Sequence, residues 1–117
     1  MKKSLREEVW AKYDGHCAYC GTSLEYKNMQ VDHYYPQKNP KYAEVYGNVK
    51  INDIENLMPS CRRCNHYKRG DIPETFRRMM RTLHDRVASI YIVKVAIDYG
   101  IVKIEPFDGK FYFEREE

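Results

Sequence analysis

The chain has 117 residues, of which 43% are hydrophobic and 32% are charged, and its formal net charge is +3. This length corresponds to one domain with a small appendage. The charged fraction, together with the lack of any apolar run near the about 20 residues of a membrane span, excludes a membrane protein. The charged N-terminus leads directly into a helical pattern, so no signal peptide is expected. We therefore expect a cytoplasmic protein whose thiols stay reduced.

The first predicted element is a short helix that leads to a Cys-x-x-Cys motif. Ser4 and Glu7 have the spacing of a capping box, and Asp14-Gly15 follows the helical pattern as a stop signal. Cys17-Ala-Tyr-Cys20 comes directly afterwards, and Gly21 permits the tight turn of a metal-binding hook. The sequence thus predicts a helix that positions the first pair of cysteines.

A strand, a loop and a second Cys-x-x-Cys motif follow. Residues 29–33 alternate in hydrophobicity as a strand does, and Pro36 ends the pattern. Residues 37–53 are predicted to form a loop that is longer than most connections. The second motif, Cys61-Arg-Arg-Cys64, opens a predicted helix that runs from Arg62 to about residue 70.

The four cysteines predict a structural zinc site. Such sites hold Zn²⁺ in a tetrahedron of thiolates, and pairs spaced as Cys-x-x-Cys are typical of them. Cys17 and Cys20 would supply one half of the tetrahedron, and Cys61 and Cys64 the other half. The alternative is two free or oxidised pairs, and the equal spacing of both pairs favours zinc over it.

The C-terminal part is predicted to be an extension made of helix and β-hairpin. Asp71 is placed as an N-cap, and a core-facing apolar stripe follows it, made of Phe76, Met80, Leu83 and Val87. Helix is expected up to Tyr99-Gly100, although the β-branched residues in 90–97 make that stretch ambiguous. Residues 101–104 and 110–113, joined by a turn, are predicted to form the hairpin.

Basic residues cluster at and after the second cysteine motif, as expected for a protein that binds a polyanion. Those predicted to bind nucleic acid are Arg62, Arg63, Lys68, Arg69, Arg77, Arg78 and Arg81. Phosphates are the expected targets, because arginine and lysine neutralise them regardless of base sequence. The alternative for the later arginines is a solvated helix face, and for Lys68 a solvated lysine.

Taken together, these motifs resemble the HNH nuclease family. The matching features, in chain order, are the first cysteine pair, Val31-Asp-His-x-x-Pro36, Glu55-Asn-Leu57, the second cysteine pair, Asn65 and Lys68. The resemblance covers roughly residues 5–70, more than half of the chain. The motif reads His-Asn-Asn here, because Asn65 stands in the place of the family's last histidine.

The resemblance implies an α+β fold of the ββα-metal (His-Me finger) type, in which a two-stranded ribbon and a helix hold one catalytic divalent ion. Here a four-cysteine zinc site would staple this core. We expect residues 1–70 to form the HNH nuclease domain. Residues 71–117, which carry no motif of the family, would form the helix and β-hairpin extension packed on the same domain.

The resemblance also implies a role for each motif residue. His33 would be the general base that deprotonates a water for attack on a phosphodiester. Asp32 and Asn65 would hold the catalytic ion, and their oxygen ligands suit Mg²⁺ or Mn²⁺. Asn56 would hold the loop and orient His33. His66 replaces Asn65 as the ligand if the helix register differs by one residue, and the family position favours Asn65.

The leading hypothesis is therefore a metal-dependent DNA endonuclease that nicks or cuts duplex DNA. A catalytically silent zinc module that binds nucleic acid or protein is the alternative, and it leaves the joint presence of Asp32, His33 and Asn65 unexplained. A third interpretation makes residues 71–117 an arm for a protein partner or a homodimer, with the nuclease working inside a larger phage or restriction complex. No membrane partner is expected.

Overall fold

The computed structural model of the protein describes residues 1–115, which fold as two compact units. The first unit comprises Met1–Pro73 together with the chain from Phe111 onward, and the second comprises Glu74–Lys110. We describe each unit by itself. No helix among the described residues has the length and apolar character that are required to cross a bilayer.

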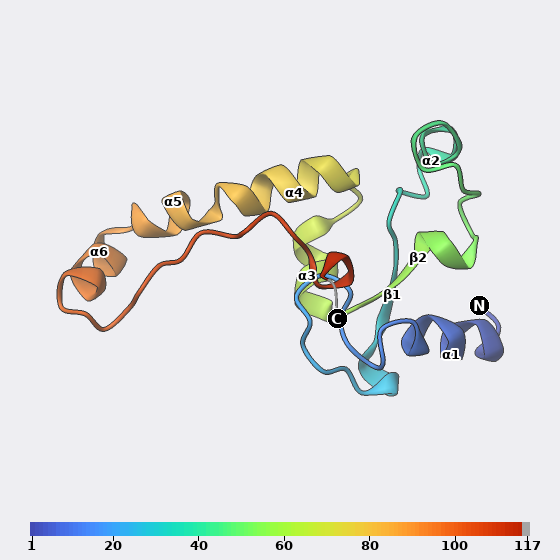
Figure 1. Cartoon of the computed structure of the whole chain (residues 1–117), viewed down its shortest axis with the longest axis horizontal. Helices are drawn as coiled ribbons and strands as arrows, with labels where there is room; N and C mark the ends of the chain where they lie inside the picture. Colours follow the sequence, from blue (N-terminus) through green and yellow to red (C-terminus); the bar gives the residue numbers. More distant parts are fainter. Residues whose placement is uncertain (116–117) are drawn as a thin grey trace. The chain divides into compact units, whose positions relative to one another are not determined.

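A two-stranded antiparallel sheet lies at the centre of the first unit (Figure 1). Strand β1 (Gln30–His33) pairs with β2 (Leu57–Ser60), so that Asp32 lies opposite Met58. Every residue of β2 is buried, as expected of a strand that is covered on both faces. The predicted strand over residues 29–33 is confirmed, apart from its first residue.

Helix α1 (Lys3–Ala11) packs against β2. Its Val9 is buried, and Arg6 donates hydrogen bonds to the carbonyls of Tyr26 and Met29, the first residue and the C-cap of the short 3-10 helix η1 (Tyr26–Asn28). The capping box predicted at Ser4 is wrong, because the helix begins one residue earlier and its N-cap, Lys2, makes no side-chain bond. Burial of the apolar face, rather than a cap, fixes this helix.

Helix α2 (Pro40–Gly47) lies inside the segment that was predicted to be a loop, so that prediction is wrong. The Asn39 side chain accepts a hydrogen bond from the Tyr42 amide, and Pro40 occupies the first turn. An asparagine N-cap followed by proline is a standard helix start. The short 3-10 helix η2 (Ile54–Asn56) then leads into β2.

Helix α3 (Arg62–Lys68) begins inside the second cysteine motif, as predicted. Cys61 is its N-cap, and its sulfur accepts a hydrogen bond from the Cys64 amide. The helix ends where Arg69 takes a positive φ of 57°. Helix α3 packs against β1, which brings the end of the zinc motif next to the strand that carries His33.

The chain returns to the first unit at Phe111, which is buried. The Tyr112 and Phe113 amides donate to the carbonyls of Tyr19 and Ala18, within the first cysteine hook, and the 3-10 helix η3 (Tyr112–Glu114) follows. The first unit therefore includes a C-terminal segment that the predicted division at residue 70 assigns to the extension.

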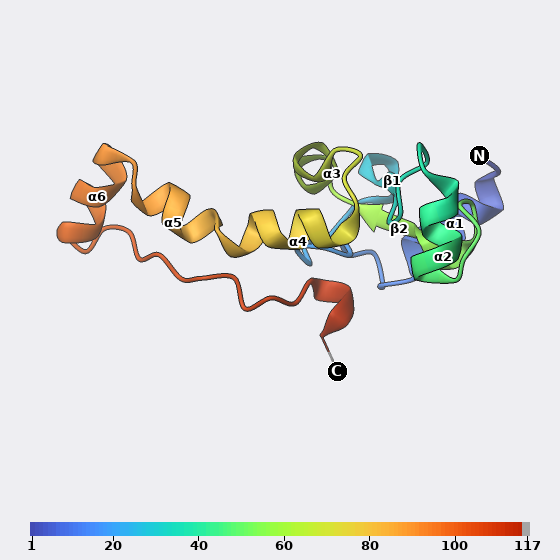
Figure 2. The ribbon, with the colours of Figure 1, turned by 90° about the horizontal axis from the view of Figure 1, so that it is seen from above.

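The second unit consists of three short helices, α4 (Pro73–Arg81), α5 (Leu83–Ala88) and α6 (Tyr91–Asp98). Figure 2 shows them following one another along the chain. The predicted helical stretch up to residue 99 is thus present but broken around Thr82 and Ser89. Thr82 is the N-cap of α5 and makes no side-chain cap hydrogen bond, and Ser89 is the C-cap of the same helix.

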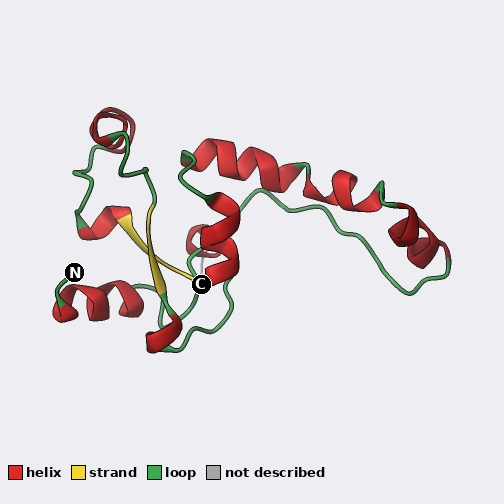
Figure 3. Ribbon diagram, turned by 180° about the vertical axis from the view of Figure 1, so that it is seen from behind, coloured by secondary structure: helices red, strands yellow, loops and turns green. Residues whose placement is uncertain are grey.

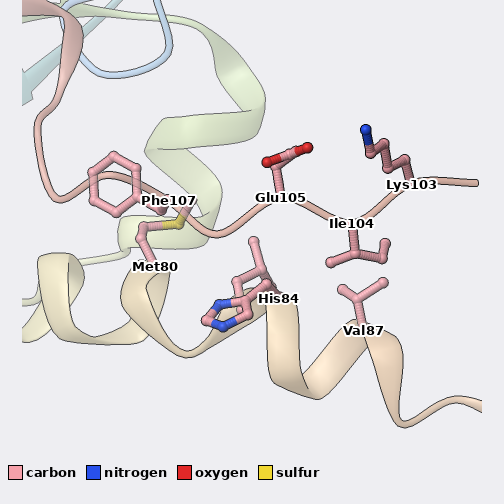
Figure 4. A pocket seen from close by; sticks show the side chains of 8 residues that line it. Met80, His84, Val87, Lys103, Ile104, Glu105 and Phe107 are labelled. Atoms are coloured by element: carbon pink, nitrogen blue, oxygen red, sulfur yellow. The ribbon is translucent and has the colours of Figure 1, made fainter.

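The predicted β-hairpin is wrong, because the described residues after α6 contain no strand (Figure 3). The amides of Ile101 and Val102 both bond to the Ala96 carbonyl, and Arg77 donates to the Gly109 carbonyl. The segment therefore pairs with the helices beside it instead of with itself. Figure 4 shows its side chains Ile104 and Phe107 next to α4 and α5, where they line a hollow of about 370 Å³.

Candidate active site and metal centre

The four cysteine sulfurs converge on one point of the first unit. All four lie within 4.8 Å of one another, and the sulfurs of Cys20 and Cys61 are 3.9 Å apart. A zinc tetrahedron with arms of about 2.3 Å has sulfur–sulfur edges of about 3.8 Å. The predicted cysteine cluster is therefore confirmed, and its dimensions fit a zinc ion.

Hydrogen bonds inside the cluster shift the thiol pKa values in opposite directions. The hydrogen bond from Cys64 lowers the pKa of Cys17 to about 4, and backbone amides contribute to the same effect. The same shared proton raises the pKa of Cys64. Burial raises the pKa of Cys20. Thiolates this close repel one another, so a cation at their centre would favour the deprotonated form of all four.

The backbone holds the first hook in a fixed shape. The Cys17 amide donates to the Thr22 carbonyl, and the Gly21 amide closes the turn on the Cys17 carbonyl. Gly21 has a φ of +81°, which strongly favours glycine. The Ala18 amide donates to the Pro59 carbonyl, which ties the hook to β2. These backbone bonds thus tie the first hook to the sheet.

Asp32 lies in a buried polar cluster between this hook and α3. The residue is 6% exposed, and its Oδ2 accepts a hydrogen bond of 2.5 Å from the Tyr19 hydroxyl. The Lys68 ammonium lies 3.2 Å from the same oxygen. Burial raises the pKa of Asp32, while the charge of Lys68 opposes that shift. Burial, together with the charge and hydrogen bond of Asp32, raises the pKa of Tyr19.

The predicted contact of Lys68 with a phosphate does not fit the position of this residue. Its side chain is fully buried, and its ammonium donates to the His33 carbonyl at 3.2 Å in addition to pairing with Asp32. A buried ammonium requires such partners, because its desolvation is costly without them. Lys68 therefore ties α3 to the strand residues Asp32 and His33.

The His33 side chain is only partly buried and points to a residue that the sequence did not single out. Its Nε2 lies 2.9 Å from the Asn52 amide oxygen. In the tautomer in which the amide oxygen accepts this hydrogen bond, Nε2 carries the proton and Nδ1 keeps its lone pair. A neutral imidazole in this tautomer can accept a proton at Nδ1.

Asn56 is almost fully buried and joins the two sides of the loop between the strands. Its amide oxygen accepts from the Tyr35 amide, and its nitrogen donates to the carbonyls of Ile51 and Tyr35. The Asn56 carbonyl also accepts from the Tyr34 amide. These bonds fix the backbone just after His33 and just before Asn52 and give Asn56 the geometry of a loop-holding residue.

Asn65 and His66 lie on different sides of α3. The Asn65 nitrogen donates to the Gln30 side chain at 2.6 Å. Gln30 and Asp32 are two residues apart on β1 and therefore share one face of the strand. His66 is exposed and lines a hollow beside Cys20 and Cys61 instead. The structure thus brings Asn65, and not His66, to the face of β1 that carries Asp32.

Comparison with known proteins agrees with this arrangement. The family model for HNH endonucleases matches residues 17–70. Residues 17–70 therefore resemble the HNH endonuclease family, and we call them the HNH segment. It contains both cysteine motifs, Asp32, His33, Asn56 and Asn65.

Two Cas9 proteins are similar to this chain. CRISPR-associated endonuclease Cas9 of Corynebacterium diphtheriae is 32% identical over 76 residues, which cover 61% of this chain and 6% of that protein. The crystal structure of the Type II-C Cas9 enzyme from Actinomyces naeslundii matches with a TM-score of 0.52 and 20% identity, over 87% of this chain and 11% of that one. The chain thus spans only a small part of the proteins it matches, and the second match shows a shared fold.

The HNH segment exposes three of the predicted phosphate-binding residues, Arg62, Arg63 and Arg69. In the second unit Arg78 and Arg81 are also exposed. The predicted phosphate contact of Arg77 does not fit its burial. Arg77 is 9% exposed, and its guanidinium donates to the Gly109 carbonyl at 2.7 Å. The predicted basic surface therefore loses its two buried members, Lys68 and Arg77.

Sequence reasoning missed three residues that support the HNH site. Gln30 could have been found, because it lies two residues before Asp32 on a predicted strand. Tyr19 sits between two predicted zinc ligands, but nothing in the sequence indicates that its hydroxyl reaches Asp32. Asn52 lies in a segment without a periodic pattern, and only the folded loop brings it to His33.

Proposed function

We propose that this protein is a metal-dependent DNA endonuclease that hydrolyses phosphodiester bonds at the site formed by β1 and α3. The observation that carries the proposal is the position of Lys68, whose ammonium contacts both the Asp32 carboxylate and the His33 carbonyl. This contact locks the helix that carries Asn65 against the strand that carries the other two motif residues. The resemblance of residues 17–70 to the HNH family supports the reaction class.

Asp32 and Asn65 have the free oxygens that a hard divalent ion requires. The Asp32 Oδ2 atom accepts a hydrogen bond from Tyr19 and forms an ion pair with Lys68, and the Asn65 side-chain nitrogen donates to Gln30. Within residues 1–115 no hydrogen bond engages the other carboxylate oxygen or the Asn65 amide oxygen. These two oxygens would hold Mg²⁺ or Mn²⁺, which would neutralise charge on the scissile phosphate.

His33 supplies the general base of the proposed reaction. With Nε2–H donating a hydrogen bond to the Asn52 amide oxygen, Nδ1 would be available to take a proton from the attacking water. Asn56 holds the backbone around this residue, so the ring is positioned before substrate arrives. The exposed arginines of the HNH segment would neutralise phosphates of the DNA on either side.

The zinc ion proposed for the cysteine cluster is structural and takes no part in the reaction. Four thiolates fill a tetrahedron and leave no position for water or phosphate. The cluster joins the first hook to the start of α3, and Tyr19 of that hook contacts Asp32. Zinc would therefore hold in place the elements from which the active site is built.

A plasmid-nicking assay tests the proposal. Purified protein should relax supercoiled plasmid in the presence of Mg²⁺ or Mn²⁺ but not in EDTA. His33→Ala should lower the rate by about 10² to 10⁴, because it removes the base. The matched variant His66→Ala removes an exposed imidazole from the same domain and should cleave at the parental rate.

Equal cleavage by the parent and His33→Ala would refute the role of His33. Binding of the plasmid without any cleavage, under all metal conditions, would instead favour the silent zinc module. Cleavage that persists undiminished in EDTA would contradict the role given to the divalent ion.

A further inference from the structure

Tyr19 has a buried hydroxyl between two of the proposed zinc ligands. The residue lies between Cys17 and Cys20 in the first hook, and it is 4% exposed. Its hydroxyl donates a hydrogen bond of 2.5 Å to the Asp32 Oδ2 atom. A buried hydroxyl requires such a partner, whereas a phenylalanine at this position would serve packing and zinc binding equally well. The hydroxyl therefore indicates a role at Asp32 rather than at the cysteine cluster.

The surroundings of Tyr19 fix the position of this hydroxyl. The ring packs edge to face against Phe111, at 5.4 Å between ring centroids, and against Phe113, at 6.4 Å. The Tyr19 carbonyl accepts a hydrogen bond from the Tyr112 amide. Two side-chain torsions place a tyrosine ring, so a bonded backbone and a packed ring leave the hydroxyl little freedom. The C-terminal segment of the first unit thus holds the phenol against Asp32.

Asp32 Oδ2 receives a second donor from another element. The Lys68 ammonium of α3 lies 3.2 Å from this atom, so the hook and the helix hold the same carboxylate oxygen. The Cβ–Cγ torsion of aspartate has a broad, roughly two-fold preference, so a carboxylate with a single donor can turn. Two donors that come from different elements restrict this rotation. The other oxygen, Oδ1, is then held in one direction.

We propose that Tyr19 is a positioning residue of the active site, whose hydroxyl holds the Asp32 carboxylate so that Oδ1 is presented to the catalytic divalent ion. This role rests on the proposed function, in which Asp32 is a ligand of that ion. Carboxylates that bind a metal are oriented by hydrogen bonds from residues that do not bind it themselves. Tyr19 supplies one of these bonds to Asp32 without being a ligand.

Loss of the hydroxyl changes the hydrogen bonds of Asp32. An ammonium has three donors, so Lys68 alone could bond to both carboxylate oxygens. Oδ1 would then be shared between Lys68 and the ion, and the ion would have to displace a buried hydrogen bond. Substitution of residues that orient metal ligands typically lowers metal affinity or activity by about 10-fold to 100-fold. We therefore expect weaker binding of the ion, with the cysteine cluster left intact.

Binding of Mn²⁺ to the full chain, without DNA, tests this role. Electron paramagnetic resonance measures the free Mn²⁺, and Tyr19→Phe should raise the Mn²⁺ dissociation constant by about 10-fold or more. In plasmid cleavage the same variant should raise the Mg²⁺ concentration that half-maximal rate requires and leave the KM for plasmid unchanged. A hydroxyl with a merely structural role would lower the thermal stability when removed and leave the Mn²⁺ dissociation constant at its parental value.

Two control variants locate the effect. Tyr13→Phe also removes a hydroxyl from a ring that contacts Phe113, but the Tyr13 hydroxyl donates to the Met58 sulfur, 3.9 Å away, and not to Asp32. It should leave the Mn²⁺ dissociation constant unchanged. Asp32→Ala should abolish binding of Mn²⁺ at this site. Each variant is measured at the zinc content of the parent and at a temperature at which circular dichroism shows that it is folded.

An unchanged Mn²⁺ dissociation constant in Tyr19→Phe, together with lost binding in Asp32→Ala, would overturn the role of Tyr19 and leave the proposed function intact. Loss of zinc from Tyr19→Phe would overturn it as well, because the hydroxyl would then serve the cysteine cluster. Binding of Mn²⁺ that Asp32→Ala leaves unchanged would instead contradict the ion site of the proposed function itself. The two failures are therefore distinguishable.

Discussion

The two units of this protein treat polar and apolar side chains in opposite ways. The first unit buries a carboxylate, an ammonium and an amide, those of Asp32, Lys68 and Asn56. The second unit leaves large apolar side chains such as Ile92 and Tyr99 in solvent. A buried charge destabilises the folded protein unless it is paired. An apolar side chain that stays in solvent contributes no hydrophobic stabilisation. The Lys68–Asp32 pair offsets the cost of burial in the first unit, whereas the exposed apolar side chains of the second unit have no such compensation.

The comparison separates two kinds of functional signal. In the first unit the buried polar residues converge on the strand that carries His33, as a preorganised active site requires. In the second unit the apolar residues form a stripe on one helix, as a protein interface requires. The first unit thus carries the proposed active site, and the exposed apolar stripe belongs to the second unit.

The largest expected effect is the loss of the zinc cluster. Cys61→Ser removes one thiolate ligand and keeps a side chain that can cap α3, so any effect reports on the metal; it should release zinc and unfold the first unit. Elemental analysis should find about one zinc ion per parental chain and much less in the variant. Thermal unfolding followed by circular dichroism should show a large loss of stability.

Parental protein that is well folded and free of zinc would contradict this prediction. The four cysteines of the chain would then be a cluster of thiols without a metal, and the fixed geometry of the first hook would depend on its backbone hydrogen bonds alone.

The next largest effect concerns the buried charge pair. Lys68→Met should destabilise the protein by about 3–5 kcal/mol, because it leaves the Asp32 carboxylate buried without its partner. Lys41→Met, the same substitution at an exposed position of α2, should change stability by less than about 0.5 kcal/mol. Urea unfolding of both variants measures the difference. Equal free energies of unfolding for Lys68→Met and Lys41→Met would mean that the ion pair with Lys68 does not stabilise buried Asp32.

A smaller effect distinguishes the two neighbouring residues of α3. Asn65→Ala should raise the Mg²⁺ concentration that half-maximal cleavage requires by about 10-fold to 100-fold, since it removes an oxygen ligand. His66→Ala should leave this concentration unchanged, because His66 lies on the zinc side of the helix. A larger effect of His66→Ala than of Asn65→Ala would make His66 the ligand. The contact between Asn65 and Gln30 would then not indicate the metal site.

Local spacing explains what could be predicted from the sequence. The cysteine cluster, β1 and α3 follow from motifs and patterns that lie within a few residues of one another, and the structure confirms all three. The contact of Asn65 with β1 also agrees with the family position. The mixed fold with a small two-stranded sheet is confirmed on the same grounds.

Tertiary contacts explain what could not be predicted. Lys68 has the sequence context of a solvated lysine, and only the packing of α3 on β1 buries it. The predicted hairpin rested on β-branched residues and an Asp108-Gly109 turn, but the backbone of this segment bonds to α6 and Arg77. The Asn52 contact with His33 likewise depends on the folded loop.

Chemical rescue tests the central claim most directly. His33→Gly deletes the proposed base and leaves a space that free imidazole can enter. The account predicts that this variant, with Mg²⁺, cleaves plasmid DNA at least about 10²-fold more slowly than the parent. Added imidazole should restore cleavage in proportion to its concentration, whereas it should not rescue Asp32→Asn. A His33→Gly variant that cleaves as fast as the parent without imidazole would contradict the assignment of His33 as the general base.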